Sequence, residues 1–237
     1  MLERDHVAAH PWGVVFDLDG TLVDSSRDIT RAVNRMLAEH RLPLLQPVQV
    51  ESLLGEGARS LISAVYEILA VPATAERVTE DTARYLEVYA QEPVRDSVLF
   101  LDARPALETL SSLGVRMGVC TNKNQDLATR VLAELEVDHF FASVVGGDVL
   151  PVRKPDPEHL LTTVRNLGLA AAQTLFVGDS RIDAECAQRA DIRCVLVDWG
   201  VPDPICVRID RFLALVDLLP TDRPTRLPPL ETSKDGT

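Results

Sequence analysis

The feature of this sequence that most constrains its fold is an alternation of short apolar runs with longer amphipathic segments. The runs are 14–16, 115–120, 140–145, 174–177 and 194–197, and the amphipathic segments are 104–113, 125–135, 157–167 and 181–190. Apart from Arg116, Ser143 and Thr174, the residues within these runs do not alternate with polar ones, as in strands that are buried on both faces of a parallel sheet. Strands that alternate with helices in this way predict an α/β domain with a parallel sheet.

Residues 25–98 interrupt this alternation, because they contain no convincing buried strand. Their pattern is typical of four helices, over 26–39, 48–53, 58–69 and 75–91, with prolines at the breaks. A segment of this length exceeds an ordinary connection. We therefore expect a small all-helical insert after the first strand, here called the helical insert, between two parts of a core at 12–24 and 99–219. The proline-rich, polar residues 220–237 are expected to form a mobile tail.

Composition excludes several classes of protein. The chain has 36 acidic and 24 basic residues, a formal net charge of −12, whereas nucleic-acid and anionic-membrane binders need a basic face. No segment is as long and apolar as a membrane span, and the N-terminus lacks a signal-peptide pattern, so we expect a cytoplasmic protein with neither nucleic acid nor membrane as a partner. The four cysteines, Cys120, Cys186, Cys194 and Cys206, fit no zinc pattern and are expected to be ordinary thiols in a reducing compartment.

Polar side chains follow four of the apolar runs. Asp17 and Asp19 follow the first run, Thr121 and Asn122 the second, a loop leading to Lys154 the third, and Asp179 and Asp183 the fourth. In an open parallel sheet, ligands bind beyond the carboxyl ends of the strands. Each group alone has an ordinary structural explanation, such as a solvated turn or a helix cap. Their occurrence at four successive strand ends indicates one site.

The chemistry of these side chains points to a metal ion and a phosphate. Carboxylates that lie close together repel one another unless a cation or a proton intervenes. Oxygen ligands with few carboxylates fit Mg²⁺. Thr121 and Asn122 offer neutral donors for phosphate oxygens, and Lys154 offers a point charge.

Lysine is rare in this chain, which has 21 arginines but only Lys123, Lys154 and Lys234. The default explanation is a compositional bias of the source genome. A compact ammonium suits the position of Lys154 in the expected site. No such argument applies to Lys123, which we expect to be a surface residue at a helix start.

These motifs together resemble the haloacid dehalogenase-like hydrolase superfamily, over about residues 14–217. The resemblance is carried by DLDGTLVDS from Asp17, the strand-end Thr121, Lys154 in KPDP, and GDSRID from residue 178. It implies a Rossmann-like core with a helical cap inserted after the first motif. The helical insert has the place and size of that cap. The family usually has glycine in the turn after GDSRID; here it is Asp191, which can adopt the left-handed conformation at some cost.

The resemblance also implies catalytic roles. Asp17 would be the nucleophile that forms an aspartyl-phosphate, and Asp19 the general acid and then the general base. Thr121 would hold phosphate oxygens together with the backbone and side chain of Asn122. Lys154 would stabilise the charge on the nucleophile and on the transferring phosphoryl group.

A magnesium site is implied by the same resemblance. The Asp17 carboxylate, the Asp19 backbone carbonyl and Asp179 would hold Mg²⁺. Asp183 would bind the metal or orient one of its waters.

Branches of the superfamily are separated by single residues. Dehalogenases and phosphonate-cleaving members lack the second aspartate, which is present here as Asp19, and no lysine lies between Asp24 and Lys123. The loop LGEGARSL at 54–61 and the segment 147–157 are similar to those of phosphoglycolate phosphatases. We therefore expect a phosphoric monoester hydrolase for a small phosphomonoester, with 2-phosphoglycolate favoured.

Other activities stay open. Another small phosphorylated metabolite, such as a sugar phosphate or a nucleotide, is the main alternative. A β-phosphoglucomutase-like mutase is less favoured, because Ala58 stands where its cap tends to carry arginine. A non-catalytic relative would typically have lost the motif aspartates. Specificity is expected in the cap loop, at Gly55, Glu56, Gly57 and Arg59, where Arg59 could meet a substrate carboxylate or be solvated. The sequence gives no indication of oligomeric state.

Overall fold

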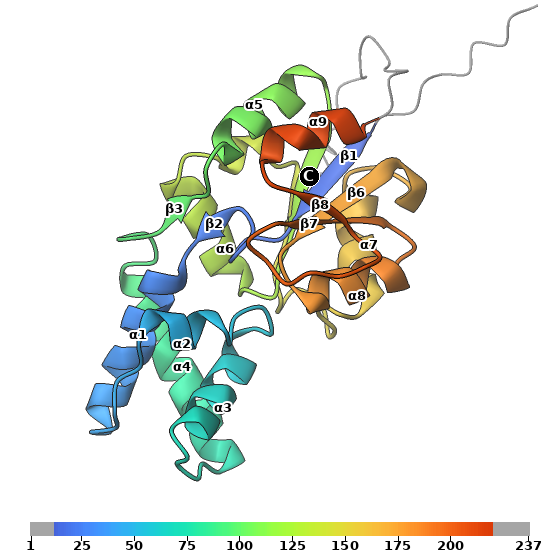
Figure 1. The fold of residues 1–237 in the computed structure, drawn as a ribbon. Coiled ribbons are helices and arrows are strands. Elements are labelled where there is room, and N and C mark those ends of the chain that lie inside the picture. Colours follow the sequence, from blue (N-terminus) through green and yellow to red (C-terminus); the bar gives the residue numbers. More distant parts are fainter. Residues whose placement is uncertain (1–11, 220–237) are drawn as a thin grey trace, which may run out of the picture.

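A parallel sheet lies at the centre of the computed structural model, which describes residues 12–219 (Figure 1). Its six strands run in the order β5-β4-β1-β6-β7-β8. They are β5 (Ser143–Val145), β4 (Arg116–Cys120), β1 (Gly13–Phe16), β6 (Thr174–Gly178), β7 (Arg193–Val197) and β8 (Val207–Ile209). Every pair of neighbours is parallel. The predicted α/β fold with a parallel sheet is confirmed.

Helices cover both faces of the sheet. One face packs against α5 (Ala103–Ser112), α6 (Gln125–Glu134) and α9 (Leu215–Leu218), and the other against α7 (Pro157–Asn166) and α8 (Arg181–Arg189). Along β1 the side chains alternate between the two layers, so that Phe16 joins the first hydrophobic cluster and Val15 the second. Both clusters exclude water from the central strands, which explains why the apolar runs in the sequence do not alternate between apolar and polar residues.

The helical insert contains four helices that pack around a hydrophobic cluster of their own. They are α1 (Ser26–Glu39), α2 (Pro47–Glu51), α3 (Ala58–Ile68) and α4 (Ala75–Gln91). They lie beyond one end of the sheet, at the bottom of Figure 1. A short antiparallel ribbon, β2 (Val23–Asp24) with β3 (Val98–Leu99), joins the two ends of the insert to the core. Leu127 of α6 belongs to the insert's cluster, so the insert and the core share a packed contact.

The expectation of four ordinary thiols is wrong for two of the cysteines. Cys194 and Cys206 form a disulfide, whereas Cys120 and Cys186 are free and buried. The reason is the register of β7 and β8: Val195 pairs with Val207, so the residues just before them face each other. Strand β8 has only three residues and no apolar run, and the sequence did not predict it.

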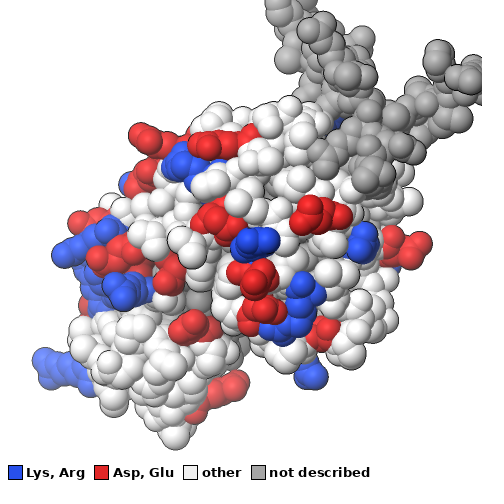
Figure 2. Space-filling view, turned by 45° about the horizontal axis from the view of Figure 1, so that its top comes forward, with Lys and Arg blue, Asp and Glu red and all other residues white. Residues whose placement is uncertain are grey.

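The turn after α8 is formed as expected, with Asp191 in the left-handed region at φ 55°. No helix within 12–219 combines the length and the apolar character needed to cross a membrane. On the face shown in Figure 2, acidic and basic side chains are interspersed rather than gathered by sign. The expected tail, 220–237, lies outside the described residues.

Candidate active site

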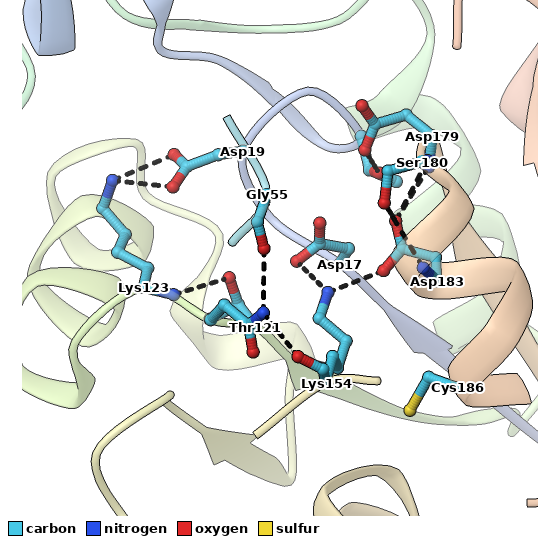
Figure 3. Close-up of polar contacts among 12 residues, drawn as sticks. Asp17, Asp19, Gly55, Thr121, Lys123, Lys154, Asp179, Ser180, Asp183 and Cys186 are labelled. Atoms are coloured by element: carbon cyan, nitrogen blue, oxygen red, sulfur yellow. Dashed lines mark hydrogen bonds and ion pairs between the residues drawn. The ribbon is translucent and has the colours of Figure 1, made fainter. Parts of the chain in front are cut away.

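The predicted polar residues meet at the carboxyl ends of the strands. Asp17 directly follows β1, Thr121 follows β4, and Asp179 follows β6. Lys154 comes from the loop between β5 and α7, and Asp183 from the first turn of α8. In Figure 3 these side chains converge on one region at the edge of the sheet. This is the arrangement that a parallel sheet imposes on residues that follow its strands.

Lys154 is the centre of a buried ion-pair network. Its Nζ lies 2.8 Å from Asp17 Oδ1 and 2.7 Å from Asp183 Oδ1, and its side chain is 1% exposed. Burial alone would lower the pKa of this ammonium, but the charges of Asp17 and Asp183 raise it well above its usual range. Lys154 is therefore a fixed positive charge beside Asp17.

Asp179 and Asp183 are held in place by hydrogen bonds from neighbouring loops and by the close approach of Gly20. Asp183 accepts hydrogen bonds from the main-chain N–H groups of Asp179 and Ser180 and from the Ser180 hydroxyl. Asp179 Oδ1 accepts from the Thr21 hydroxyl at 2.8 Å. Gly20 has φ +84°, and a Cβ there would lie 2.5 Å from Asp179 Oδ2. Only glycine allows this close approach, which explains its place after the aspartates.

The three carboxylates of Asp17, Asp179 and Asp183 fit a divalent cation. Each offers an oxygen within 4.8 Å of the others. Burial, opposed by Lys154 and reinforced by Asp183, raises the pKa of Asp17 to about 6. Burial followed by the charges of Asp183 and Asp17 raises the pKa of Asp179 to about 8. The raised pKa values show that the three carboxylates, when all are ionised, carry more negative charge than Lys154 compensates. Hard oxygen donors of this kind suit Mg²⁺.

These raised pKa values predict a link between pH and the stability of the metal-free protein. A carboxyl group whose pKa is raised on folding stabilises the fold below its unfolded pKa, and this contribution is lost as the pH rises through the folded pKa. For Asp17 and Asp179 the window runs from about 4 to about 8. We expect the melting temperature in EDTA to fall across this range, and Mg²⁺ to raise it by about 5 °C more at pH 8 than at pH 5. Thermal unfolding at both pH values, with KCl at matched ionic strength as the control, checks this; an equal gain at both would contradict it.

Asp19 lies apart from this cluster and is paired with Lys123. Lys123 Nζ lies 2.9 and 3.0 Å from the two carboxylate oxygens of Asp19, and it donates a hydrogen bond to the Tyr89 hydroxyl at 2.8 Å. The Lys123 side chain is only 5% exposed. The expectation that Lys123 is a surface residue is therefore wrong: helix α4 of the helical insert covers it.

Asn122 joins the helical insert to the core. Its side-chain amide donates to the carbonyl of Gly55, at 2.8 Å, and to the carbonyl of Lys154, at 3.0 Å. Gly57 lies so close that a Cβ there would be 3.0 Å from the Asn122 carbonyl oxygen. Both N–H groups of the Asn122 amide are thus used within the protein. Its Oδ1 is buried without a hydrogen-bond partner among the described residues.

A pocket between the helical insert and the core contains this region. It is lined by Asp17, Asp19, Thr121, Asn122, Lys123, Gly55 and Gly57, by Tyr85 and Tyr89 of α4, and by apolar residues of α1, α3, α6 and the loop before α3. Glu56 lines a separate pocket, which lies between the insert and Ile182 of α8. Arg59 is exposed, and its guanidinium donates to the hydroxyl of Thr79. Of the four predicted specificity residues, the structure brings the two glycines to this pocket.

Sequence reasoning missed Lys123 and Tyr89 as parts of the site. Tyr89 lies on an amphipathic helix of the insert, where the sequence pattern of a tyrosine indicates only an ordinary core residue. Lys123 carried one signal, because it is one of only three lysines and follows Thr121 and Asn122 directly. Its burial depends on how α4 packs over the strand end, which no local pattern reveals.

Comparisons with known proteins agree with this geometry. A family model described as haloacid dehalogenase-like hydrolase matches residues 14–197. The phosphoglycolate phosphatase of Pectobacterium atrosepticum is 36% identical over 217 residues, which cover 87% of this chain and 92% of the relative. The phosphoglycolate phosphatase of Rhodospirillum rubrum is 37% identical over 196 residues, with 80% of each chain covered.

A solved structure gives the same result for the fold. The crystal structure of a predicted phosphoglycolate phosphatase from Haemophilus somnus superposes with a TM-score of 0.79 at 27% identity. The match covers 88% of this chain and 97% of that one, so it includes both the sheet and the helical insert.

Proposed function

The chain belongs to the haloacid dehalogenase-like hydrolases, and from that premise we propose that it is a phosphatase that hydrolyses 2-phosphoglycolate through an aspartyl-phosphate. The observation that carries this proposal is that Asp17, which lines a pocket together with a second aspartate, Asp19, lies 2.8 Å from the buried ammonium of Lys154. A nucleophilic carboxylate beside a fixed cation, with a second carboxylate two residues away, is the donor set that phosphoryl transfer to an aspartate requires.

In the first half of the proposed reaction, a carboxylate oxygen of Asp17 attacks phosphorus and the bond to the substrate's alcohol oxygen breaks. Asp19 gives its proton to that oxygen. Lys154 stays within reach of Asp17 and neutralises charge that gathers on the phosphoryl oxygens. Since the Asn122 amide is committed to Gly55 and Lys154, phosphate contacts from this strand end would come from Thr121 and from main-chain N–H groups.

In the second half, Asp19 accepts a proton from a water molecule as that water attacks phosphorus. Phosphate leaves, and the carboxylate of Asp17 is restored. The hydrogen bond from Asn122 to Gly55 holds the insert's loop against the core. We propose that the helical insert thereby acts as a cap that limits access of bulk water and of large substrates.

Asp17, Asp179 and the backbone carbonyl of Asp19 would hold Mg²⁺, with Asp183 oriented by Ser180 and Lys154 behind them. When bound, the ion supplies charge neutralisation and polarisation of the phosphoryl oxygens. Asp17 and Asp19 line the pocket, so the binding of a small anionic substrate requires that a cation compensate their negative charge.

The proposal is tested by phosphate release from a panel of phosphomonoesters, assayed with Mg²⁺ and with EDTA. We expect 2-phosphoglycolate to have the highest kcat/KM, by at least about tenfold over a sugar phosphate, a nucleoside monophosphate and p-nitrophenyl phosphate. EDTA should lower turnover by about 100-fold or more. A preference for another member would correct the substrate, and isomerisation of a sugar 1-phosphate without phosphate release would indicate a mutase. No turnover of any member would overturn the proposal.

A further inference from the structure

One cation lines the pocket within residues 12–219, and it is Lys123. Resting on the function proposed above, we propose that Lys123 and Tyr89 bind the carboxylate of the substrate, on the Asp19 side of the pocket. This subsite makes Lys123 the specificity-determining residue for a phosphomonoester that carries a second anion.

Donors remain available at this position. An ammonium has three N–H donors, and Lys123 makes three hydrogen bonds, two to the oxygens of the Asp19 carboxylate and one to the Tyr89 hydroxyl. The Tyr89 oxygen accepts the hydrogen bond from Lys123, and no acceptor for its own hydrogen is found among the described residues. The O–H of Tyr89 can therefore bond a third group, and an N–H of Lys123 can reach the same group when it gives up one of its two hydrogen bonds to Asp19. Tyr89 is 1% exposed, so this O–H is held in place rather than solvated.

Lys154 gives a precedent for this geometry within the same molecule. There, one buried ammonium lies between two carboxylates, at 2.8 Å from Asp17 and 2.7 Å from Asp183. A substrate carboxylate beside Lys123 would form the matching arrangement with Asp19 as the other carboxylate. The shared cation would offset the repulsion between an anionic substrate and the ionised form of Asp19, before Asp19 takes up the proton that it gives to the leaving alcohol.

The surroundings strengthen an ionic contact at Lys123. Much of the pocket wall is apolar, with Ile29, Leu53, Leu54, Leu61, Leu86 and Leu127 among its residues. A charge pair that is shielded from water by such a wall is stronger than one at the surface. The enclosed ring of Tyr89, whose centroid lies 4.4 Å from Lys123 Nζ, further holds the ammonium in this orientation.

The arginines near the insert's loop are less suited to this role. Arg59 is exposed and bonded to Thr79, away from the pocket wall. Arg153 lies with its Nη1 3.3 Å from the position of a Cβ at Gly57. Neither guanidinium is among the groups that line the pocket.

The test uses two substrates that differ only in the second anion: 2-phosphoglycolate and 2-hydroxyethyl phosphate. The wild-type protein is expected to prefer 2-phosphoglycolate by about 100-fold in kcat/KM. Lys123→Met should remove most of this preference, mainly through KM for 2-phosphoglycolate. Tyr89→Phe, which keeps the ring and deletes the hydroxyl, should reduce the preference by about fivefold to tenfold.

Binding measurements separate this role from an effect exerted through Asp19. In an Asp17→Asn background, titration calorimetry with 2-phosphoglycolate should show weaker binding after Lys123→Met, while 2-hydroxyethyl phosphate should bind as before. If Lys123→Met lowers kcat/KM equally for both substrates, Lys123 acts only by positioning Asp19 and the inference is overturned. It is also overturned if Arg59→Met or Arg153→Met removes the preference instead. A wild-type protein that hydrolyses both substrates equally would refute the proposed substrate, which is a different outcome.

Discussion

Replacing Asp17 with asparagine is expected to lower kcat by about four orders of magnitude or more while the protein stays folded. An amide oxygen is a poor nucleophile and cannot form the mixed anhydride with phosphate, so the proposed reaction loses its first step. Steady-state phosphate release with 2-phosphoglycolate and Mg²⁺ measures this effect. A variant that retains near wild-type turnover would show that the nucleophile lies elsewhere.

The same substitution has an expected signature in stability. Asp17 is buried, and its raised pKa of about 6 shows that its charged form is disfavoured in the metal-free fold. Asparagine has the same shape and no charge, so the metal-free melting temperature at pH 8 should not fall. Lys154 keeps its second partner, Asp183, at 2.7 Å.

Asp24→Asn is the matched control for Asp17→Asn. Asp24 belongs to the same sequence motif, but its carboxylate accepts hydrogen bonds from the main-chain N–H and the hydroxyl of Ser26, the first residue of α1. The chemical change is identical and the position lies outside the pocket lining. We expect kcat within about twofold of wild type.

The elements that could be predicted are those whose burial leaves a pattern of apolar residues in their own sequence. Strands β1, β4 and β6 are covered on both faces, so, apart from Arg116 and Thr174 at their first positions, their residues do not alternate between apolar and polar. Strand β8 and the ribbon of β2 with β3 have two or three residues each, too few for a periodic pattern. The disulfide between Cys194 and Cys206 could not be predicted for the same reason, because it follows from the pairing of β8.

The candidate site divides in a similar way. Asp17, Thr121 and Asp179 could be placed together, because a parallel sheet brings the residues after its strands to one edge. The contact between Lys123 and Tyr89 joins residues 34 positions apart, on the core and on the helical insert. Such a contact is fixed by how two hydrophobic clusters pack against each other, and only the structure gives that.

Replacing Lys154 with methionine is the second change with a large expected effect, and it acts on both activity and stability. Turnover should fall by about a thousandfold or more, because the cation next to the nucleophile is lost. The side chain is 1% exposed, and its removal leaves Asp17 and Asp183 without their shared partner. Breaking a buried ion pair by removing one partner costs about 3–5 kcal/mol. We therefore expect the melting temperature to fall by about 10 °C at pH 8.

The pH dependence of this loss distinguishes charge from packing. Lys154 lowers the pKa of Asp17, so without Lys154 this carboxylate is harder to ionise in the fold. Protonation of Asp17 at pH 5 should therefore relieve part of the cost, and the deficit in melting temperature should shrink from pH 8 to pH 5. A loss of packing alone would give the same deficit at both pH values. Lys154→Arg is the matched control: it keeps the charge, so it should retain more stability than methionine, while the larger planar fork should still lower turnover. Full turnover in Lys154→Met, or a melting temperature equal to that of the wild type, would contradict the role assigned to this ammonium.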